Sequence, residues 1–404
     1  LLGTALGAIV GMGYGRGAYA QGVLAGDITT SNTGTVELEG PDEFVTGSDF
    51  SVDTSDSGGD GIIITTPSGE TGDTVFNDQN DSTITGAEYG IDADNDGTGA
   101  LSITTTGTVT GAEKDSIYAN NSAAGTGLTI DVNKVTNDAN FRVGIRSKQY
   151  GSGDLTISVR GGIRTLGNAI YSINNGPGNT LIEARGYLYA DSSTIFHSGK
   201  SGTGNLTVNL DANIQNTTGN TSVFLEQYSG DVSVTSAGTI DGGYGIGAYA
   251  GGFSGSGGGS VNITSSSEIE NEGIGIVARS YGDDVTITSN GKIAAGNIGI
   301  AALGEGANSA VNIKSNGDIT TTESEGTVWF GAEKSGIHAY NAGAGGITIE
   351  ASGDIQSASQ GIYADNNGTG ALSITTTGTV TGTAGDGIYA NNSSNSTGDL
   401  TITA

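Results

Sequence analysis

The sequence predicts an all-β fold, a three-sided parallel β-helix (solenoid) with about 27 residues per coil. Three observations predict it: short apolar phrases recur in a fixed order, apolar and polar residues alternate within each phrase, and Gly, Asn, Asp and Ser separate the phrases. Such repetition is typical of solenoids, in which no single coil buries its apolar face and stacking buries a continuous column. We expect a right-handed winding.

Each coil contains three phrases, Gly-Ile-x-Ala, Leu/Val-x-Ile and Gly-x-Ile/Val, and each phrase predicts one short strand. In the copy that begins at Gly361, Ile362 and Ala364 point to one side of the strand and Tyr363 to the other, because side chains alternate along a strand. Strands in Leu372–Ile374 and around Val380 follow in the same coil. Gly, Asn, Asp and Ser between them supply the turns.

The spacing of the first phrase sets the size of the coil. Twelve of its aliphatic residues can be followed from Ile91 to Ile388, and the eleven intervals average about 27 residues, within the range of solenoid repeats. At roughly 4.8 Å per coil, twelve coils predict a rod about 55–60 Å long. A β-sandwich would not repeat three phrases in one order. The 73 Gly and the net charge of −29 suggest disorder, but a disordered chain would not need aliphatic residues at regular intervals.

The chain divides into three parts by composition. Residues 1–20 contain an apolar stretch and the sequence Ala18-Tyr19-Ala20, which predicts the remnant of a secretory signal peptide. Residues 21–60 are expected to form a cap or irregular start, and residues 61–404 the solenoid, which we expect to be truncated at its C-terminus. The chain has no Cys, which excludes a disulfide framework and a thiolate metal site.

The repeats resemble the passenger domains of Gram-negative autotransporters (type V secretion). The resemblance is carried by GIYANNSSNSTGDLTI at Gly387–Ile402 and GALSITTTGTVTG at Gly370–Gly382, together with the missing Cys and the acidic composition. It implies export through the periplasm, passage through an outer-membrane translocator barrel C-terminal to this fragment, and display on the cell surface or secretion. It implies no particular ligand.

A calcium loop is suggested at Asp92, Asp94 and Asp96, which have D-x-D-x-D-G spacing. The twelfth position holds Ile103 instead of Glu, and a nearly identical second copy has Tyr363 in place of Asp92. We interpret these residues as turn formers and expect no metal and no cofactor.

The interval from Ile300 to Ile337 is the widest between successive copies of the first phrase and predicts an insertion between coils. It holds Trp329, the single Trp of the chain, and Phe330. Apolar aromatic residues on an insertion suit stacking on a sugar or a contact with a partner, and a loop folded back on the rod is the alternative. The candidate ligand-binding residues here are Trp329, Phe330, Glu333 and Lys334.

A second candidate is the segment from Lys134 to Lys200, which holds eight of the 14 basic residues and four acidic ones. Its net charge of +4 contrasts with −33 for the remainder, and Arg146 takes the outward position that Tyr118 and Tyr171 take in adjacent coils. A basic stripe flanked by Tyr could bind a sulfated glycan or another polyanion; ordinary solvation is the alternative. The candidate residues are Arg142, Arg146, Lys148, Arg160 and Arg164.

These patterns favour a cell-surface β-helical passenger that acts as an adhesin-like, host-interacting scaffold and is not an enzyme. Its expected partner is a host surface glycan or protein, and the acidic remainder disfavours nucleic acid. A β-helical carbohydrate-active enzyme or a passive structural stalk are the alternatives. A carboxylate cluster beside a groove on one face would indicate the enzyme.

Overall fold

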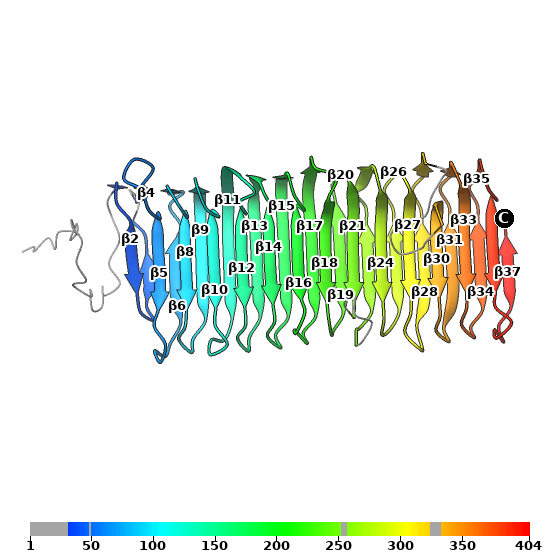
Figure 1. Cartoon of the computed structure of the whole chain (residues 1–404), viewed down its shortest axis with the longest axis horizontal. Coiled ribbons are helices and arrows are strands. Elements are labelled where there is room, and N and C mark those ends of the chain that lie inside the picture. Colours follow the sequence, from blue (N-terminus) through cyan, green and yellow to red (C-terminus); the bar gives the residue numbers. More distant parts are fainter. Residues whose placement is uncertain (1–30, 48–49, 252–256, 324–332) are drawn as a thin grey trace, which may run out of the picture.

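The computed structural model shows a long rod of parallel strands that lie across the rod axis (Figure 1). It describes residues 31–47, 50–251, 257–323 and 333–404. These residues form 37 strands and no helix, so within them there is no helix that could cross a membrane. Strands pair with the equivalent strands one coil earlier and one coil later, always in parallel.

The first face of the rod is a 14-stranded parallel sheet with one strand from each coil. Most of its strands carry the Gly-Ile-x-Ala phrase or a close variant, whose β-branched residue and alternating pattern favour extended backbone. In chain order they are β2 (Val36–Glu39), β5 (Ile62–Thr66), β8 (Ile91–Asn95), β10 (Ile117–Asn121), β12 (Ile145–Gln149), β14 (Ile170–Asn174), β16 (Ile195–Gly199), β18 (Thr221–Gln227), β21 (Tyr244–Ala250), β24 (Ile274–Ser280), β27 (Ile298–Gly304), β30 (Ser335–Asn341), β33 (Gln360–Asn366) and β36 (Ile388–Asn392).

The second and third faces form one 23-stranded sheet, because in the middle of the rod a single strand bends across both. These shared strands are β9 (Leu101–Gly111), β11 (Leu128–Asn140), β13 (Leu155–Leu166), β15 (Thr180–Ala190) and β17 (Leu206–Asn216). In the next coil the path divides at Gly238, where φ is +97° and a Cβ atom would lie 2.3 Å from the carbonyl oxygen of Ala212. Glycine therefore fits there without strain.

Separate strands form these two faces in the other coils. On the second face they are β3 (Glu43–Val45), β6 (Thr74–Asp78), β19 (Val232–Ala237), β22 (Val261–Ser265), β25 (Val285–Ser289), β28 (Ala310–Ser315), β31 (Gly346–Ala351), β34 (Leu372–Thr376) and β37 (Leu400–Thr403). On the third face they are β1 (Ser31–Asn32), β4 (Ser51–Asp53), β7 (Thr83–Gly86), β20 (Thr239–Gly242), β23 (Glu268–Asn271), β26 (Ile293–Ala295), β29 (Ile319–Thr321), β32 (Ile355–Ser357) and β35 (Val380–Gly382).

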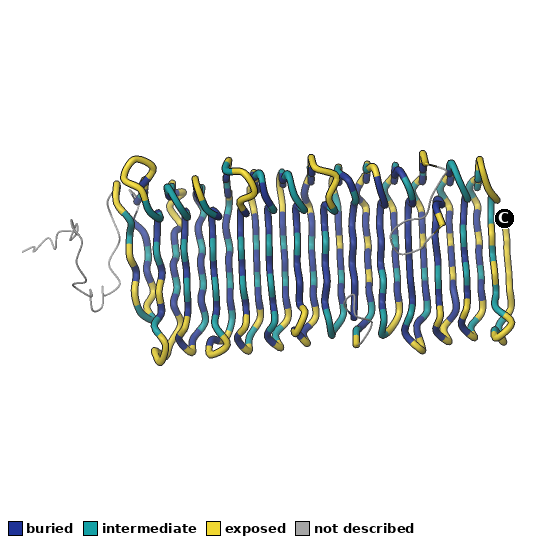
Figure 2. Tube along the Cα trace, viewed as in Figure 1, coloured by how far each residue is buried: buried dark blue, intermediate teal, exposed yellow. Residues whose placement is uncertain are grey.

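Aliphatic side chains stack in columns inside the rod. Ile117, for example, lies in register with Ile91 in the preceding coil and Ile145 in the next, and all three are fully buried. Buried residues alternate with less buried ones along most strands, and exposed residues concentrate at the turns (Figure 2). The steps between successive first-face strands average about 27 residues, a period typical of solenoids. The parallel β-solenoid and its coil length are confirmed; the winding hand stays a prediction.

A second interior column consists of amide side chains at the corner between the first and second faces. The Asn95 Nδ2 atom donates to Oδ1 of Asn121 at 2.7 Å, and Nδ2 of Asn121 donates to Oε1 of Gln149 at 2.7 Å. Asn121 also donates to the carbonyl oxygen of Gly127, at 3.2 Å, in the turn that follows. The column thus satisfies buried turn carbonyls that no strand can reach.

The parallel ladder already includes residues that the sequence placed in an irregular start at 21–60. Strand β2 pairs with β5 through Val36 with Ile62 and Leu38 with Ile64. The sequence of β2, VELE, lacks the Gly and Ala of the phrase, although its Leu38 is buried like the equivalent residues of later coils. Residues 1–20, where a signal peptide remnant is predicted, lie outside the described part of the chain.

Candidate binding surface

The outward side of the first face carries one continuous row of side chains, here called the outer row. Each member is the variable residue of the Gly-Ile-x-Ala phrase, and strand pairing stacks it on its equivalents in the neighbouring coils. In chain order the row is Ile63, Asp92, Tyr118, Arg146, Tyr171, Phe196, Phe224, Gly247, Val277, Ala301, His338, Tyr363 and Tyr389.

Aromatic rings in the outer row stack along the rod axis. The Tyr171 and Phe196 ring centroids are 4.9 Å apart, and those of Phe196 and Phe224 are 5.2 Å apart, with the planes nearly parallel. Tyr249, which lies two residues after the row position, continues the stack at 5.4 Å from Phe224. Cross-strand aromatic pairs stabilise neighbouring strands, so these outward rings contribute to the stability of the first-face sheet.

Beyond this stack the first face is apolar on its outward side too. We call the six residues there the outer cluster; they are Tyr249, Ile274, Val277, Ile298, Ala301 and Leu303. They are no more than 5% exposed, and they form a cluster separate from the interior columns. An apolar outward side is unusual for a solenoid coil, whose outward positions are normally polar. Because these side chains are almost inaccessible to solvent, the outer cluster is a second small core on the outward side of the sheet and not an exposed patch.

A cavity of about 330 Å³ opens at the edge of the outer cluster. It forms beside Gly247, which leaves the outer row without a side chain between Phe224 and Val277. The Tyr249 ring fills part of this gap, because a Cβ atom on Gly247 would lie 3.2 Å from Tyr249 Cε2. The cavity is lined by Thr221, Phe224, Tyr244, Ile246, Tyr249, Ile274 and Val277.

Sequence reasoning missed this surface, although a signal was present. Strands β24 and β27 read IGIVARS and IGIAALG, with apolar residues at both odd and even positions. Continuous apolar runs indicate a strand that is covered on both sides. The repeated phrase marks Ile276 and Ile300 as inward residues but leaves their apolar neighbours Val277 and Ala301 unassigned.

The predicted basic residues are distributed over more than one face. Arg146 and Lys148 point outward on β12 in the first face, whereas Arg160 and Arg164 lie on β13. Arg142 is exposed in the turn before β12. The predicted alignment of Arg146 with Tyr118 and Tyr171 is confirmed.

Acidic neighbours pair with three of these basic residues. Arg146 bonds to Asp115, Arg164 bonds to Asp138, and Arg160 lies 3.3 Å from Asp131. Asp115 and Asp131 lie outside the net-positive segment from Lys134 to Lys200. Coil stacking brings them next to Arg146 and Arg160, so part of the positive charge counted in that segment is neutralised. Lys148 lies 5.1 Å above the Tyr118 ring. The stripe is therefore less available to a polyanion than its sequence suggests.

The residues of the insertion have different surroundings. Trp329 and Phe330 lie outside the described residues. Glu333 is exposed, whereas Lys334 is buried with its Nζ 2.8 Å from Oε2 of Glu323. The predicted register of Ile300 with Ile337 across the long interval is present. Within the described ranges, these residues are not brought together with the basic set.

The suggested calcium loop also takes a different form. Asp94 accepts a hydrogen bond from Asn120 in the next coil, at 3.0 Å. Burial, together with the nearby carboxylates of Asp94 and Asp60, raises the pKa of Asp92 to about 6. The described part of the chain contains no group of three or more His, Cys, Asp or Glu residues placed to hold a metal ion.

The raised pKa of Asp92 predicts that Asp92→Tyr, which copies Tyr363 of the second copy, stabilises the protein at pH 7. A carboxyl whose folded pKa of about 6 exceeds its ordinary 3.8 destabilises the fold as pH rises through that window. After allowance for its partial exposure, we expect a gain of about 0.5–1 kcal/mol, part of it from stacking on Tyr118. Urea unfolding at pH 7 and pH 4 measures it. An equal gain at both pH values would show that charge is irrelevant.

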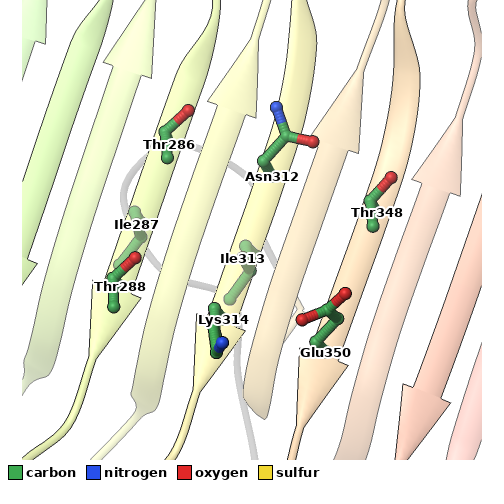
Figure 3. Close-up of a pocket in the computed structure, with 8 residues that line it drawn as sticks. All are labelled: Thr286, Ile287, Thr288, Asn312, Ile313, Lys314, Thr348 and Glu350. Atoms are coloured by element: carbon green, nitrogen blue, oxygen red, sulfur yellow. The ribbon is translucent and has the colours of Figure 1, made fainter.

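A second, shallow cavity of about 210 Å³ lies on the second face. Figure 3 shows polar side chains projecting from three adjacent strands: Thr286, Thr288, Asn312, Lys314, Thr348 and Glu350. Glycoside hydrolysis ordinarily requires two carboxyl groups across the bond to be cleaved. Glu350 is the one carboxylate among the described residues of this lining, so the cavity has the polarity of a sugar site without that pair.

Comparison with known proteins adds no relative. No protein-family model matches the chain, and no curated protein or solved structure is detectably similar to it. The fold is therefore established by the structure itself, and the site must be argued from its residues.

Proposed function

We propose that this chain is the displayed passenger of an autotransporter-type protein and acts by binding a ligand on the surface of a host cell. The observation that carries the proposal is the cavity beside Gly247, which lies on the outward side of the first face between the aromatic stack and the outer cluster. The aromatic stack and the outer cluster stabilise neighbouring strands, but coil stacking does not require a cavity lined by aromatic and aliphatic side chains. Clustered aromatic and aliphatic residues around a cavity are typical of interface hot spots.

The rod supports display as well as binding. Each coil contacts mainly its neighbours, so coils can fold one after another as a chain emerges from a pore. The absence of Cys is compatible with passage through a pore in an unfolded state. On this proposal, a translocator barrel and a signal peptide belong to the full-length protein.

Attachment of coated beads to cells tests the function. Fluorescent beads coated with the purified chain are expected to attach to cultured epithelial cells, and excess soluble chain should displace them. Cells treated with protease or with glycosidases distinguish a protein partner from a glycan. Attachment no greater than that of beads coated with albumin, or attachment that soluble chain does not displace, would contradict an adhesin-like role.

A further inference from the structure

The cavity beside Gly247 has a lining that selects among ligand classes. Its walls are the side chains of Phe224, Tyr244, Tyr249, Ile274 and Val277. Its polar groups are the Thr221 hydroxyl and the two tyrosine hydroxyls. Sugar rings carry several hydroxyl groups that require partners, whereas an aromatic or large aliphatic side chain requires few. The lining therefore favours an apolar side chain over a sugar.

The geometry of the stack also suits a flat apolar group. Phe196 and Phe224 have centroids 5.2 Å apart with planes 8° from parallel, so their rings lie across the rod axis. On the far side of Gly247 the next row member is Val277. The Tyr249 ring already lies beside Phe224, with the two centroids 5.4 Å apart, and covers part of Gly247. A ring that entered the cavity would therefore lie against the Tyr244 and Tyr249 rings and the side chains of Ile274 and Val277 that line it.

Acidic residues border the cavity on the third face. Asp241 precedes Tyr244 by three residues, and Glu272 precedes Ile274 by two. These acidic residues therefore lie close in sequence to two residues that line the cavity. Asp241 pairs in register with Glu270, and Glu268 lies on the same strand. The acidic border consists of Asp241, Glu268, Glu270 and Glu272.

This border keeps most of its negative charge. The four carboxylates are joined by no ion pair with a described residue, and the adjacent Lys292 leaves a net charge of −3. On the other side of the cavity Arg279 is neutralised by Glu305, with its Nε 2.9 Å and its Nη2 2.6 Å from the same carboxylate oxygen. A partner that enters from the third face therefore meets negative charge.

We propose that the cavity and its acidic border bind a basic polypeptide segment that inserts one aromatic side chain beside Gly247. This inference rests on the proposed function and narrows its partner from a glycan or a protein to a protein. The inserted ring supplies the apolar contact and fixes the register. Lys and Arg residues flanking it in the segment pair with the acidic border.

Binding of short labelled peptides to the intact chain tests the proposal. The probes are Lys-Gly-Lys-Trp-Lys-Gly-Lys and the same peptide with Ser in place of Trp, followed by fluorescence anisotropy. The Trp peptide should bind saturably and at least about tenfold more tightly than the Ser peptide. Raising the salt from about 50 mM to about 300 mM should weaken it, because the border charges are exposed. Equal binding of the two peptides would overturn the insertion.

Two kinds of variant assign the binding to this site. Gly247→Leu fills the gap and should weaken binding of the Trp peptide about tenfold or more. Tyr244→Ala removes a half-buried side chain from the cavity wall and should weaken binding by a similar factor, which keeps the test valid if the leucine disturbs the strand. The triple reversal Glu268→Lys, Glu270→Lys, Glu272→Lys should reduce the salt dependence. Its matched control reverses three exposed carboxylates at the far end of the rod: Glu37→Lys, Glu39→Lys and Glu43→Lys.

The outcomes separate this inference from the broader function. Peptide binding that none of the cavity variants changes would overturn the site. If bead attachment depended on cell-surface glycans while neither peptide bound, the protein partner would be wrong and a first-face adhesin could still stand. If bead attachment also failed, both would be wrong.

Discussion

Asn121→Ala is expected to lower the free energy of unfolding by about 2–4 kcal/mol, because it leaves buried polar atoms without partners. The side chain accepts from Asn95 and donates to Gln149 and to the Gly127 carbonyl. Asn121 is fully buried, so water cannot replace these bonds without opening the corner. The effect should include the neighbouring coils, since one amide column joins them.

The neighbouring residue provides a matched control for this experiment. Asn120 points outward, is half-buried and donates a single hydrogen bond to Asp94 at 3.0 Å. Asn120→Ala should cost less than about 1 kcal/mol. Urea unfolding followed by circular dichroism measures both variants. Similar losses for the two substitutions would mean that the amide column contributes no more than an outward side chain.

Acidification below about pH 6.5 is expected to destabilise the protein through its two histidines. His197 is fully buried inside the rod, where Nδ1 lies 2.7 Å from the Ser172 hydroxyl, and His338 is 5% exposed in the outer row. Burial lowers the pKa of each from 6.5 to about 4. The unfolded chain therefore binds more protons between these values, and stability falls as pH decreases through the window.

Each histidine should lower the free energy of unfolding by about 3 kcal/mol by pH 4. The double variant His197→Leu, His338→Tyr uses the residues found one coil later, Leu225 and Tyr363. It should remove most of the difference in stability between pH 6.5 and pH 4 while folding at pH 7. Measurements of urea midpoints across that range test it. A double variant that loses as much stability as the wild type would place the acid sensitivity in the carboxylates instead.

The interior of the rod could be predicted from the sequence because one physical rule governs it. Coil stacking requires an aliphatic residue at the same position in every coil, and Ile91, Ile117 and Ile145 obey that rule. The repeat thus predicted the strands, the three faces and the coil length. It was less informative for residues 21–60, where VELE departs from the phrase although the backbone pairing is the same.

The corner amides and the ion pairs depend on neighbours in adjacent coils. Asn121 resembled a turn residue. Alternation puts it on the same side as Ile117 and Ala119, but the sequence does not show that its amide bonds to Asn95 and Gln149 in the adjacent coils. The basic segment looked unbalanced because Asp115 and Asp131, the partners of Arg146 and Arg160, lie one coil earlier in the chain. Charge counted along the chain therefore misses pairs that stacking creates between coils.

The candidate binding surface could not be predicted from the sequence for a related reason, since it also depends on residues in adjacent coils. The continuous apolar run that contains Val277 indicates a covered strand, but Gly247 at the variable position of its phrase carries no signal alone. Only when coils are stacked does a glycine between Phe224 and Val277 become a gap in a row. Trp329 and Phe330, which the sequence favoured, lie outside the described residues and stay predictions.

The most direct test of the account compares two tyrosines in the bead-attachment assay. Tyr244 lines the cavity on the first face, whereas Tyr187 is 46% exposed on β15 and does not line it. If the first face is the binding surface, Tyr244→Ala should reduce attachment about tenfold and Tyr187→Ala should leave it unchanged, with both variants folded by circular dichroism. Undiminished attachment by Tyr244→Ala, or equal loss in both variants, would contradict it.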